Sequence, residues 1–523
     1  GLGRLLVDAG QRVGGDPPVF IDLIDPHRDA AGDPTLLHRH AVELVARLHG
    51  AFVVRDDDEV AAIEERLASV RRSLPSNDRL AAAIANVLDE LVFDIETTED
   101  VAHQLAYYES IGGLHVLVDL PASVASVTAE DVRRVAASYL LPERRTIAWY
   151  EPGDKAMPEW SKPMVSLPGT RVASALPDRT PVPPPSAHQL GGSLPVVVRQ
   201  SDLSPTAHVK IVVAGNRLDG DGLSADDPLF GYSSLNYRLK SVDLGVVLER
   251  AATHIRAVEY VDSMATMGSE DPTTRLEETF ASLMAPLLPA TSPDARPVLI
   301  VVSGDVDADE TVALLETHFG NVIPSDSTSV EFAPVPAGER LIAMDKPVAQ
   351  AALGYIVRAP GMATQHYDAW RVLLYILSHG YEGRLGIEAI ANRGLAYYIG
   401  SEYRSDGPNG WITLSIGVDP GKIDSLRDLL QVELERLVLE PPSASEVAEA
   451  KAHIIGRFIS AEQSNAEIAD GLATQWLGHG RLMNVEDWQS RLGDVSVADV
   501  QAAAAEFING LTIMVRYGAG TAE

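Results

Sequence analysis

Three side chains that could bind a metal ion gather near residue 40: His38, His40 and Glu43. A helical zinc site needs two histidines one turn apart on one helix face, as in H-E-x-x-H or the inverse H-x-x-E-H, plus a further ligand. His40 and Glu43 have the inverse spacing, but Leu44 stands where the second histidine would be. No H-x-x-E-H occurs anywhere in the sequence. The segment therefore reads as an ordinary amphipathic helix with a solvated polar face.

A second pattern imitates a calcium-binding loop. Asp305, Asp307 and Asp309 alternate, and Glu316 stands at the twelfth loop position. Such a loop needs glycine at its sixth position for a sharp turn, and Glu310 occupies that position. Helical periodicity also begins inside the loop, so we expect Asp307 or Asp309 to cap a helix instead.

The most informative stretch runs from 378 to 401. Glycines recur at every third position in a predicted loop, a short helix follows, and Gly394 ends that helix before a strand begins. Arg384 lies at the helix start and Tyr397 on the strand. Taken alone, Arg384 would be a surface charge and Tyr397 a core aromatic residue.

The composition excludes several kinds of site. The sequence has no cysteine, so disulfides, thiolate metal sites and cysteine nucleophiles are ruled out. It contains no Gly-rich phosphate loop, dinucleotide fingerprint or nucleophile elbow. Lys and Arg number 42 against 74 Asp and Glu, and the resulting net charge of −32 repels nucleic acid and anionic lipid. We therefore expect neither a nucleic-acid nor a membrane partner.

The length of 523 residues predicts about three or four domains. No apolar run approaches the roughly 20 residues that span a bilayer. The start at Gly1 shows no signal peptide, which favours a cytoplasmic location. Prolines concentrate between 151 and 200, and the run Pro181-Val182-Pro183-Pro184-Pro185 favours extended polyproline geometry. We interpret residues 154–192 as a Pro-rich linker.

The segments on either side of this linker resemble each other. Each has a strand, a Gly/Pro turn and a second strand, near 1–26 in the first copy and 394–420 in the second. Helical patterns follow in both, such as the leucine stripe of 426–437 and the helix that Thr128 would cap. A final strand ends each copy, at 146–150 and 512–517. The chain thus contains an internal duplication.

Residues 193–340 form a third α/β unit. Strand patterns cover 196–198, 209–213 and 297–303, and a helix runs through Leu314 and Leu315. The strand pattern stops abruptly between 216 and 228, and no long helix follows. This break, and a start partway through the first copy, suggest that segments are missing before Gly1 and within 216–228.

The stretch around residue 390 resembles the pitrilysin, insulin-degrading enzyme and mitochondrial processing peptidase family of zinc peptidases, the inverzincins. The resemblance depends on Gly383-Arg384-Leu385 and on Arg393-Gly394-Leu395-Ala396-Tyr397. Supporting segments are Ser303-Gly304-Asp305-Val306-Asp307, Pro347-Val348-Ala349-Gln350-Ala351 and Val127-Thr128-Ala129-Glu130-Asp131-Val132. The resemblance covers nearly everything outside the linker.

The resemblance implies an α+β fold of repeated two-layer α/β sandwich modules, arranged as two lobes of a clamshell around an unfolded peptide. Residues 1–153 would be a second-type module without its N-terminal part, 193–340 a shortened third module, and 341–523 a fourth module. In the first copy, Arg4 stands where the fourth module has Tyr397.

In such proteins the fourth-module Arg and Tyr reach across the chamber, so the resemblance implies that Arg384 and Tyr397 are catalytic residues. Both side chains would donate hydrogen bonds to a peptide carbonyl as negative charge develops. The family's zinc is held by H-x-x-E-H and a distal Glu in module one, so zinc is expected for the family but has no ligands in this sequence. Either the zinc module belongs to residues outside the sequence, or a zinc-bearing homologous subunit supplies it. A homodimer mate is a further possible partner. The alternative function is a non-catalytic subunit or a peptide-binding or assembly protein of the same fold.

Overall fold

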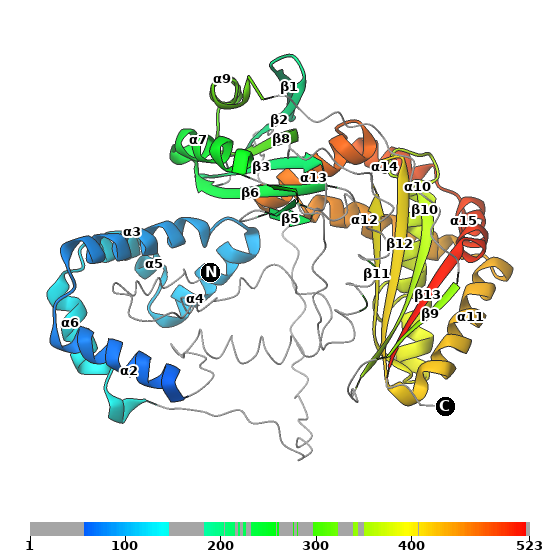
Figure 1. Cartoon of the computed structure of the whole chain (residues 1–523), viewed down its shortest axis with the longest axis horizontal. Helices are drawn as coiled ribbons and strands as arrows, with labels where there is room; N and C mark the ends of the chain where they lie inside the picture. The colour runs from blue at the N-terminus through cyan, green and yellow to red at the C-terminus, as the bar shows by residue number, and fades with distance from the viewer. Residues whose placement is uncertain are drawn as a thin grey trace.

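The computed structural model (Figure 1) describes residues 57–145, 183–202, 204–214, 232–257, 297–322, 350–405 and 407–518. It also describes the short segments 218–219, 223–225, 259–260 and 338–343, and positions 276 and 280. The strands expected near 1–26 and at 146–150, the metal-like cluster near His40 and the break expected within 216–228 lie wholly or mostly outside these residues.

A group of helices forms the first described part of the chain (Figure 1). These are α2 (Asp57–Arg72), α3 (Asn77–Phe93), α4 (Thr98–Ile111), α5 (Leu114–Ala125) and α6 (Ala129–Tyr139). Thr128 caps α6 by accepting the backbone N–H of Asp131, whose carboxylate in turn accepts the backbone N–H of Thr128. This reciprocal capping confirms the helix start predicted at Thr128.

The second part is a six-stranded sheet in the order β1-β2-β8-β3-β6-β5. Its strands are β1 (Ser186–Leu190), β2 (Leu194–Gln200), β3 (Thr206–Ala214), β5 (Leu223–Ala225), β6 (Tyr232–Lys240) and β8 (Pro297–Gly304). The two-residue strands β4 (Leu218–Asp219) and β7 (Glu259–Tyr260) pair separately. The strands predicted at 196–198, 209–213 and 297–303 are confirmed as β2, β3 and β8.

The C-terminal end of the linker predicted over 154–192 is wrong, because strand β1 occupies Ser186–Leu190. β1 pairs with β2 in antiparallel register, and Leu190 is buried in the core beneath the sheet. Gly191 and Gly192 connect the two strands with φ angles of 54° and 76°, which glycine adopts without steric cost. The proline-rich composition ends at Pro185, and the few residues after it were too short a run to be distinguished as a strand.

Two helices, α7 (Leu244–His254) and α9 (Ala308–Phe319), cover one face of this sheet. Their buried side chains, such as Leu248 and Leu315, pack against Val209, Ile211 and Ile300. Asp307 accepts the backbone N–H of Glu310 at 2.9 Å and caps α9. The capping role expected for Asp307 is therefore confirmed.

The third part is a five-stranded sheet in the order β11-β12-β10-β13-β9. Its strands are β9 (Gly338–Ala343), β10 (Ala351–Pro360), β11 (Ala396–Ser405), β12 (Asn409–Val418) and β13 (Leu511–Gly518). β11 and β12 form the predicted hairpin, and β13 is the predicted final strand. The boundary expected at 340/341 cuts through β9, which pairs in parallel with β13 and so belongs to this sheet.

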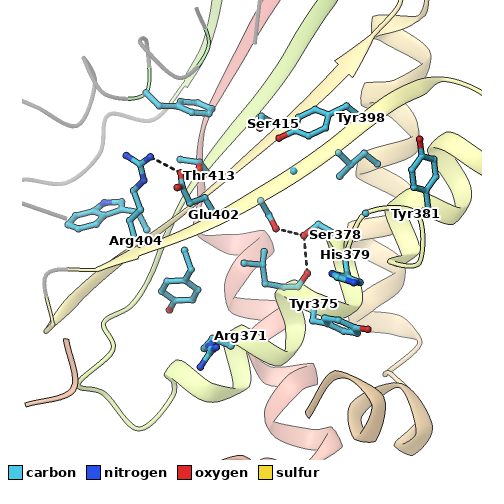
Figure 2. Close-up of a pocket in the computed structure, with 18 of the residues that line it drawn as sticks. Arg371, Tyr375, Ser378, His379, Tyr381, Tyr398, Glu402, Arg404, Thr413 and Ser415 are labelled. Atoms are coloured by element: carbon cyan, nitrogen blue, oxygen red, sulfur yellow. Dashed lines mark hydrogen bonds and ion pairs between the residues drawn. The ribbon is translucent and has the colours of Figure 1, made fainter. Parts of the chain in front are cut away.

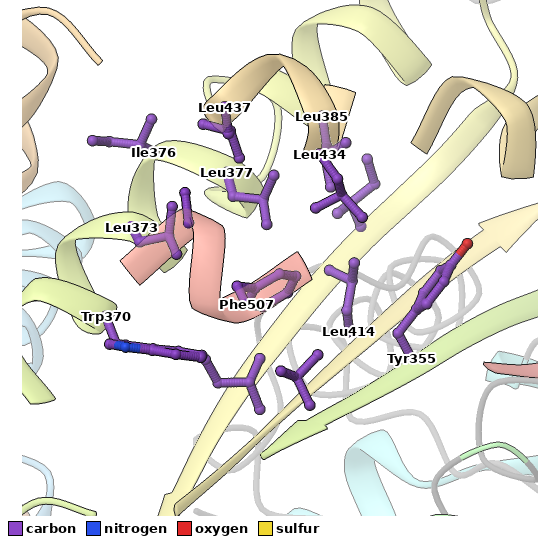
Figure 3. Close-up of a cluster of buried hydrophobic side chains, with 14 of the residues drawn as sticks. Tyr355, Trp370, Leu373, Ile376, Leu377, Leu385, Leu414, Leu434, Leu437 and Phe507 are labelled. Atoms are coloured by element: carbon purple, nitrogen blue, oxygen red, sulfur yellow. The ribbon is translucent and has the colours of Figure 1, made fainter. Parts of the chain in front are cut away.

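Helices cover one face of the third part. They are α10 (Tyr367–Ser378), α11 (Ile423–Leu439), α12 (Ala444–Ser460), α14 (Val485–Gly493) and α15 (Val497–Asn509), whereas α13 (Asn465–His479) packs on the six-stranded sheet. Figure 3 shows Trp370 and Leu373 of α10 close to Phe507 of α15, with Leu434 and Leu437 of α11 nearby. The leucine stripe predicted over 426–437 is buried throughout, which confirms it.

Helix α13 leaves this layer and packs on the opposite face of the six-stranded sheet. Its Ile468 and Leu472 contact strand residues such as Val212 and Leu299. The helix start is held by hydrogen bonds: Asn465 donates its amide to the Thr206 carbonyl at 3.1 Å. A second contact involves the five-stranded sheet. Leu276 and Phe280, which precede β8 in the sequence, lie against Gly354 of β10, where a Cβ atom would come within 2.6 Å of the Phe280 ring. Each sheet thus receives a helical contact from the other part of the chain.

The predicted α+β class is confirmed. Within the described residues, no helix combines the length and apolar composition that crossing a bilayer requires.

Candidate functional site

The glycine-rich turn after α10 is built by close backbone contacts. A Cβ atom on Gly386 would lie 1.9 Å from the Gly380 carbonyl oxygen, and one on Gly383 would lie 2.6 Å from the His379 nitrogen. Only glycine fits such approaches, which explains the three-residue spacing in the sequence. A short π-helix over 386–392 follows, and Gly394, at φ 56°, directs the chain into β11.

Arg384 projects from this turn toward the start of α12. Its Nε and Nη2 atoms donate to the two carboxylate oxygens of Glu446 at 2.9 and 3.1 Å, and its Nη1 donates to the Glu440 carbonyl at 3.3 Å. The Arg384 side chain is 18% exposed. Arg384 is the main cause that lowers the pKa of Glu446 to about 2, with backbone and side-chain hydrogen bonds from Ser443 adding to it. This ion pair fixes the guanidinium in the native structure.

Tyr397 sits on an irregularity at the start of β11. Ala396 opposes Val418, and Tyr398 opposes Gly417, so Tyr397 is an extra residue in the ladder. Such a bulge turns a side chain away from the regular alternation. The Tyr397 ring lies over Gly417, where a Cβ atom would be 2.5 Å from its Cε2. Gly417 therefore provides the space that the displaced ring occupies.

A cavity of about 750 Å³ lies beside β11, and Tyr397 contributes to its wall. Figure 2 shows Tyr398 and Ser415 on one side of the hairpin and Ser378, His379 and Tyr375 on the other. Arg384 is not among the residues that line this cavity. The structure thus brings Tyr397 to an open space and Arg384 to Glu446.

Two polar contacts in the cavity wall were not anticipated from the sequence. Arg404 and Glu402 form an ion pair at 2.7 Å on β11 (Figure 2). Ser378 and Ser401 share a hydrogen bond of 2.6 Å that ties the end of α10 to the middle of β11. The period-two alternation of β11 could have indicated that Glu402 and Arg404 share a face. Nothing local could have paired Ser378 with Ser401.

A buried aromatic and charged cluster lies behind this wall. Tyr367 and Tyr403 meet edge to face with their ring centroids 4.8 Å apart, and His479 approaches Tyr367 at 5.3 Å. Burial lowers the pKa of His479 to about 3, and the charges of Arg491 and Arg371 act in the same direction. Burial also raises the pKa of Tyr403, so both groups stay uncharged over the ordinary pH range.

A second aromatic cluster stands at the end of α10. The rings of Tyr375 and His379 stack at 4.4 Å, and His453 of α12 lies 4.4 Å from His379 and 4.6 Å from Tyr375. Burial is the main cause that lowers the pKa of His453, and His379 adds to the effect. This wall of the cavity is therefore aromatic.

The zinc ion of the resembling peptidases does not fit the described part of this chain. No three His, Asp or Glu side chains there are arranged so that they could hold a metal ion. His38, His40 and Glu43 lie outside the described residues. Among the residues that the structure describes, no acidic side chain is placed with His379 and His453 so that the three could hold a metal ion.

Comparison with known proteins finds similarity to peptidases and to one inactive peptidase domain. Residues 295–454, which include Arg384 and Tyr397, match the family described as the Peptidase M16 inactive domain. An uncharacterized zinc protease of Mycobacterium leprae is 26% identical over 230 residues, which cover 42% of this chain and 50% of that protein. The beta subunit of mitochondrial-processing peptidase from Blastocladiella emersonii is 26% identical over 223 residues, covering 40% of this chain and 47% of that subunit. The chain spans about half the length of the curated relatives it matches.

One solved structure supports the fold. The peptidase M16 inactive domain from Pseudomonas fluorescens matches with a TM-score of 0.52 at 16% identity, covering 65% of this chain and 99% of that one. At this identity the likeness concerns the fold and not the activity.

Proposed function

We propose, from the premise that the chain belongs to the pitrilysin/insulinase (M16) family of peptidases, that it forms one wall of a chamber in which unfolded peptides are enclosed and hydrolysed. The observation that carries this proposal is the position of Tyr397. It stands on a β-bulge, outside the regular strand alternation, and its ring borders a cavity of about 750 Å³. A tyrosine placed in this way can donate a hydrogen bond to a ligand in that space.

Tyr397 would donate its hydroxyl hydrogen to a peptide carbonyl oxygen as negative charge develops there. Arg384 would add a second donor. Because Arg384 is bound to Glu446, its action on a substrate requires either that one guanidinium N–H reach the peptide while the ion pair persists, or that the pair open. The ion pair keeps the charge of Arg384 in a fixed place and removes part of the cost of ordering a flexible side chain.

The zinc in this proposal comes from other residues, either a module outside the 523-residue sequence or a zinc-bearing homologous subunit. The second source is consistent with the similarity to a protein that is itself called a subunit. The two sheets and the helical group would then be the modules of a two-lobed clamshell.

The competing proposal is a non-catalytic subunit that binds peptides without hydrolysing them. The ion pair between Arg384 and Glu446 favours it, since a guanidinium held this way can serve the fold alone. The description of the matched family as an inactive domain also favours it.

The test measures zinc content and the hydrolysis of a quenched fluorescent peptide by the purified 523-residue chain, alone and mixed with a zinc-bearing M16 subunit of the same organism. We expect substoichiometric zinc and no hydrolysis alone, and chelator-sensitive hydrolysis above that of the subunit itself in the mixture. Stoichiometric zinc with hydrolysis by the chain alone would reject a separate zinc source. A mixture no more active than the subunit alone would favour the binding-only function.

A further inference from the structure

One charged side chain in the cavity wall has no ion-pair partner among the described residues. Arg371 of α10 is half-buried and lines the cavity from the side of the hairpin that also carries Tyr375 and His379 (Figure 2). Within the ranges that the structure describes, its guanidinium meets two aromatic rings and no carboxylate. The guanidinium carbon lies 5.6 Å from the ring centroid of Tyr367 and 5.3 Å from that of Trp488. The packing therefore orders the cation without neutralising it.

The neighbouring arginines differ from Arg371 in this respect. Arg404 pairs with Glu402 at 2.7 Å, and Arg491 pairs with the buried Asp368 at 2.8 Å. A half-buried cation that has lost part of its hydration and gained no counter-ion is costly. An anion that enters the cavity would offset that cost at Arg371, whereas the paired arginines already have their anions.

Arg371 also determines the net charge of the cavity wall. The guanidinium and carboxylate groups that border the cavity belong to Arg371, Arg404 and Glu402, so one positive charge remains beside the ion pair. The chain as a whole carries a net charge of −32, so this positive excess is local. The same charge acts on His479: burial is the main cause that lowers its pKa to about 3, and Arg491 and Arg371 add to the effect. This end of the cavity therefore favours a group with a single negative charge.

We propose that Arg371 binds a carboxylate of the peptide in the cavity and so selects peptides that carry an acidic side chain or a free C-terminus at this end. This inference rests on the proposed function, because it names the class of substrate that the same cavity takes. A planar guanidinium matches a carboxylate with two parallel N–H donors. The rings of Tyr367 and Trp488 hold the guanidinium in place before the ligand arrives, which lowers the entropy cost of binding.

The place of Arg371 predicts where the carboxylate lies relative to the cleaved bond. Tyr367, over which the guanidinium lies, packs against Tyr403 with the ring centroids 4.8 Å apart, so Arg371 lies near the Tyr403 end of the cavity. Tyr397 borders the same cavity six residues earlier on β11. Six strand residues extend over about 20 Å, and an extended peptide covers that distance in about six residues. We therefore expect the carboxylate about six residues from the bond that Tyr397 acts on.

The first experiment varies the peptide and leaves the 523-residue chain unchanged. The probe is the decapeptide Ser-Val-Thr-Phe-Ser-Leu-Thr-Val-Ser-Glu with an N-terminal dansyl group, which is uncharged near neutral pH, and fluorescence anisotropy follows its binding. A second version has an amidated C-terminus, a third has Gln in place of Glu, and a fourth has both changes and no carboxylate. We expect the fourth to bind about 10-fold more weakly than the first. The second and third versions distinguish the side-chain carboxylate from the terminal one.

The second experiment locates the bound carboxylate. Arg371→Gln should bind the first and fourth probes about equally, whereas Arg371→Lys, which keeps the charge, should retain part of the preference. Arg457→Gln is the matched control and should retain all of it, because Arg457 is an exposed residue of α12 that does not border the cavity. Since Arg371 also packs against Trp488, circular dichroism and urea unfolding check that each variant folds like the unmodified chain.

A complex that hydrolyses peptides gives an independent measurement. Moving the Glu of the amidated probe by two positions should move the cleaved bond by two positions, which mass spectrometry of the products detects. A cleaved bond that ignores the position of Glu would overturn the placement of the carboxylate at Arg371.

The binding outcomes are decisive without hydrolysis. A preference for carboxylate-bearing probes that is lost in Arg371→Gln and kept in Arg457→Gln supports the inference, even if no hydrolysis is found. Equal binding of the four probes, no measurable binding, or a preference that persists in Arg371→Gln overturns it. Hydrolysis that depends on Tyr397 but shows no preference for a carboxylate would leave the proposed function standing without this substrate class.

Discussion

Arg384 and Glu446 are joined by two hydrogen bonds, of 2.9 and 3.1 Å, although they lie 62 positions apart in the sequence. The same carboxylate accepts the backbone N–H of Ser443 at 2.8 Å and so completes the cap at the start of α12. The turn that carries Arg384 is thereby fixed to the first turn of a helix in the same layer. Arg384, which we expect to act on a substrate, therefore also helps to hold the tertiary structure together.

Glu446→Gln should destabilise the chain. Glutamine keeps the size of the side chain but loses the charge and one of the two acceptor oxygens, so we expect a loss of about 1–2 kcal/mol in the free energy of unfolding. Urea unfolding followed by circular dichroism measures it. The control, Glu435→Gln on the exposed face of α11, should change stability by less than about 0.5 kcal/mol. Equal effects of the two variants would show that the ion pair contributes nothing to stability.

The pH dependence of this ion pair has a defined sign. The pKa of Glu446 is about 2 in the folded chain, below its ordinary value of 4.5. Its contribution to stability is therefore complete above about pH 4.5 and is lost as the pH falls toward 2. The stability difference between the unmodified chain and Glu446→Gln should shrink over that range. A difference that stays constant down to pH 3 would contradict the assignment.

Arg384→Lys tests whether the guanidinium geometry matters for turnover. Lysine keeps the charge but cannot form two parallel hydrogen bonds, so we expect kcat to fall about tenfold or more in a hydrolysing complex. Arg393→Lys is the matched control, since its side chain is 53% exposed and pairs only loosely with Glu388, at 3.6 Å. A kcat for Arg384→Lys within twofold of that for Arg393→Lys would assign Arg384 to the fold alone.

Leu472→Ala tests the contact between α13 and the six-stranded sheet. Leu472 is 7% exposed and packs against the sheet across the boundary between the two parts of the chain. Truncating a buried leucine leaves a cavity, so we expect a loss of about 2–4 kcal/mol. Val432→Ala, at a side chain that is 55% exposed, is the control and should have little effect. Two separate unfolding transitions in Leu472→Ala would indicate that this contact couples the two sheets.

His479 should make the chain sensitive to mild acid. Its pKa is about 3 when folded and about 6.5 in an ordinary environment, so the unfolded chain binds more protons between these values. Stability should therefore fall as the pH drops below about 6.5, by about 2 kcal/mol at pH 5 from this residue. His479→Gln should flatten the slope of unfolding free energy against pH, whereas His115→Gln, at an exposed position, should not. Identical slopes would mean that His479 titrates normally.

Much of the fold was predictable because its signals are local. The leucine stripe of 426–437, the caps at Thr128 and Asp307, and the strands at 209–213 and 297–303 follow from periodicity and capping chemistry within a few residues. The strand β1 was assigned to the linker because a five-residue strand after a proline run gives too short a pattern. Local sequence patterns thus predicted which segments form helices and strands, but they placed the ends of these elements only to within a few residues.

The site was only partly predictable. Glycine spacing indicated the turn that carries Arg384, and the resemblance identified Tyr397. The carboxylate that holds Arg384 is 62 residues away, and the bulge at Tyr397 depends on its register against β12. The cavity beside β11 also depends on the sheet order, which no single segment encodes. These features arise from long-range pairing and could not be read from one sequence.

The most direct test of the proposed function is the turnover of Tyr397→Phe in a complex that hydrolyses peptides. Phenylalanine removes one hydroxyl and keeps the ring over Gly417, so the fold should be retained. Tyr381→Phe is the matched control, because Tyr381 also borders the cavity and is 67% exposed. We predict that kcat falls about 10- to 100-fold in Tyr397→Phe with KM nearly unchanged, while Tyr381→Phe behaves like the unmodified chain. A kcat for Tyr397→Phe equal to that of the unmodified chain would contradict the account.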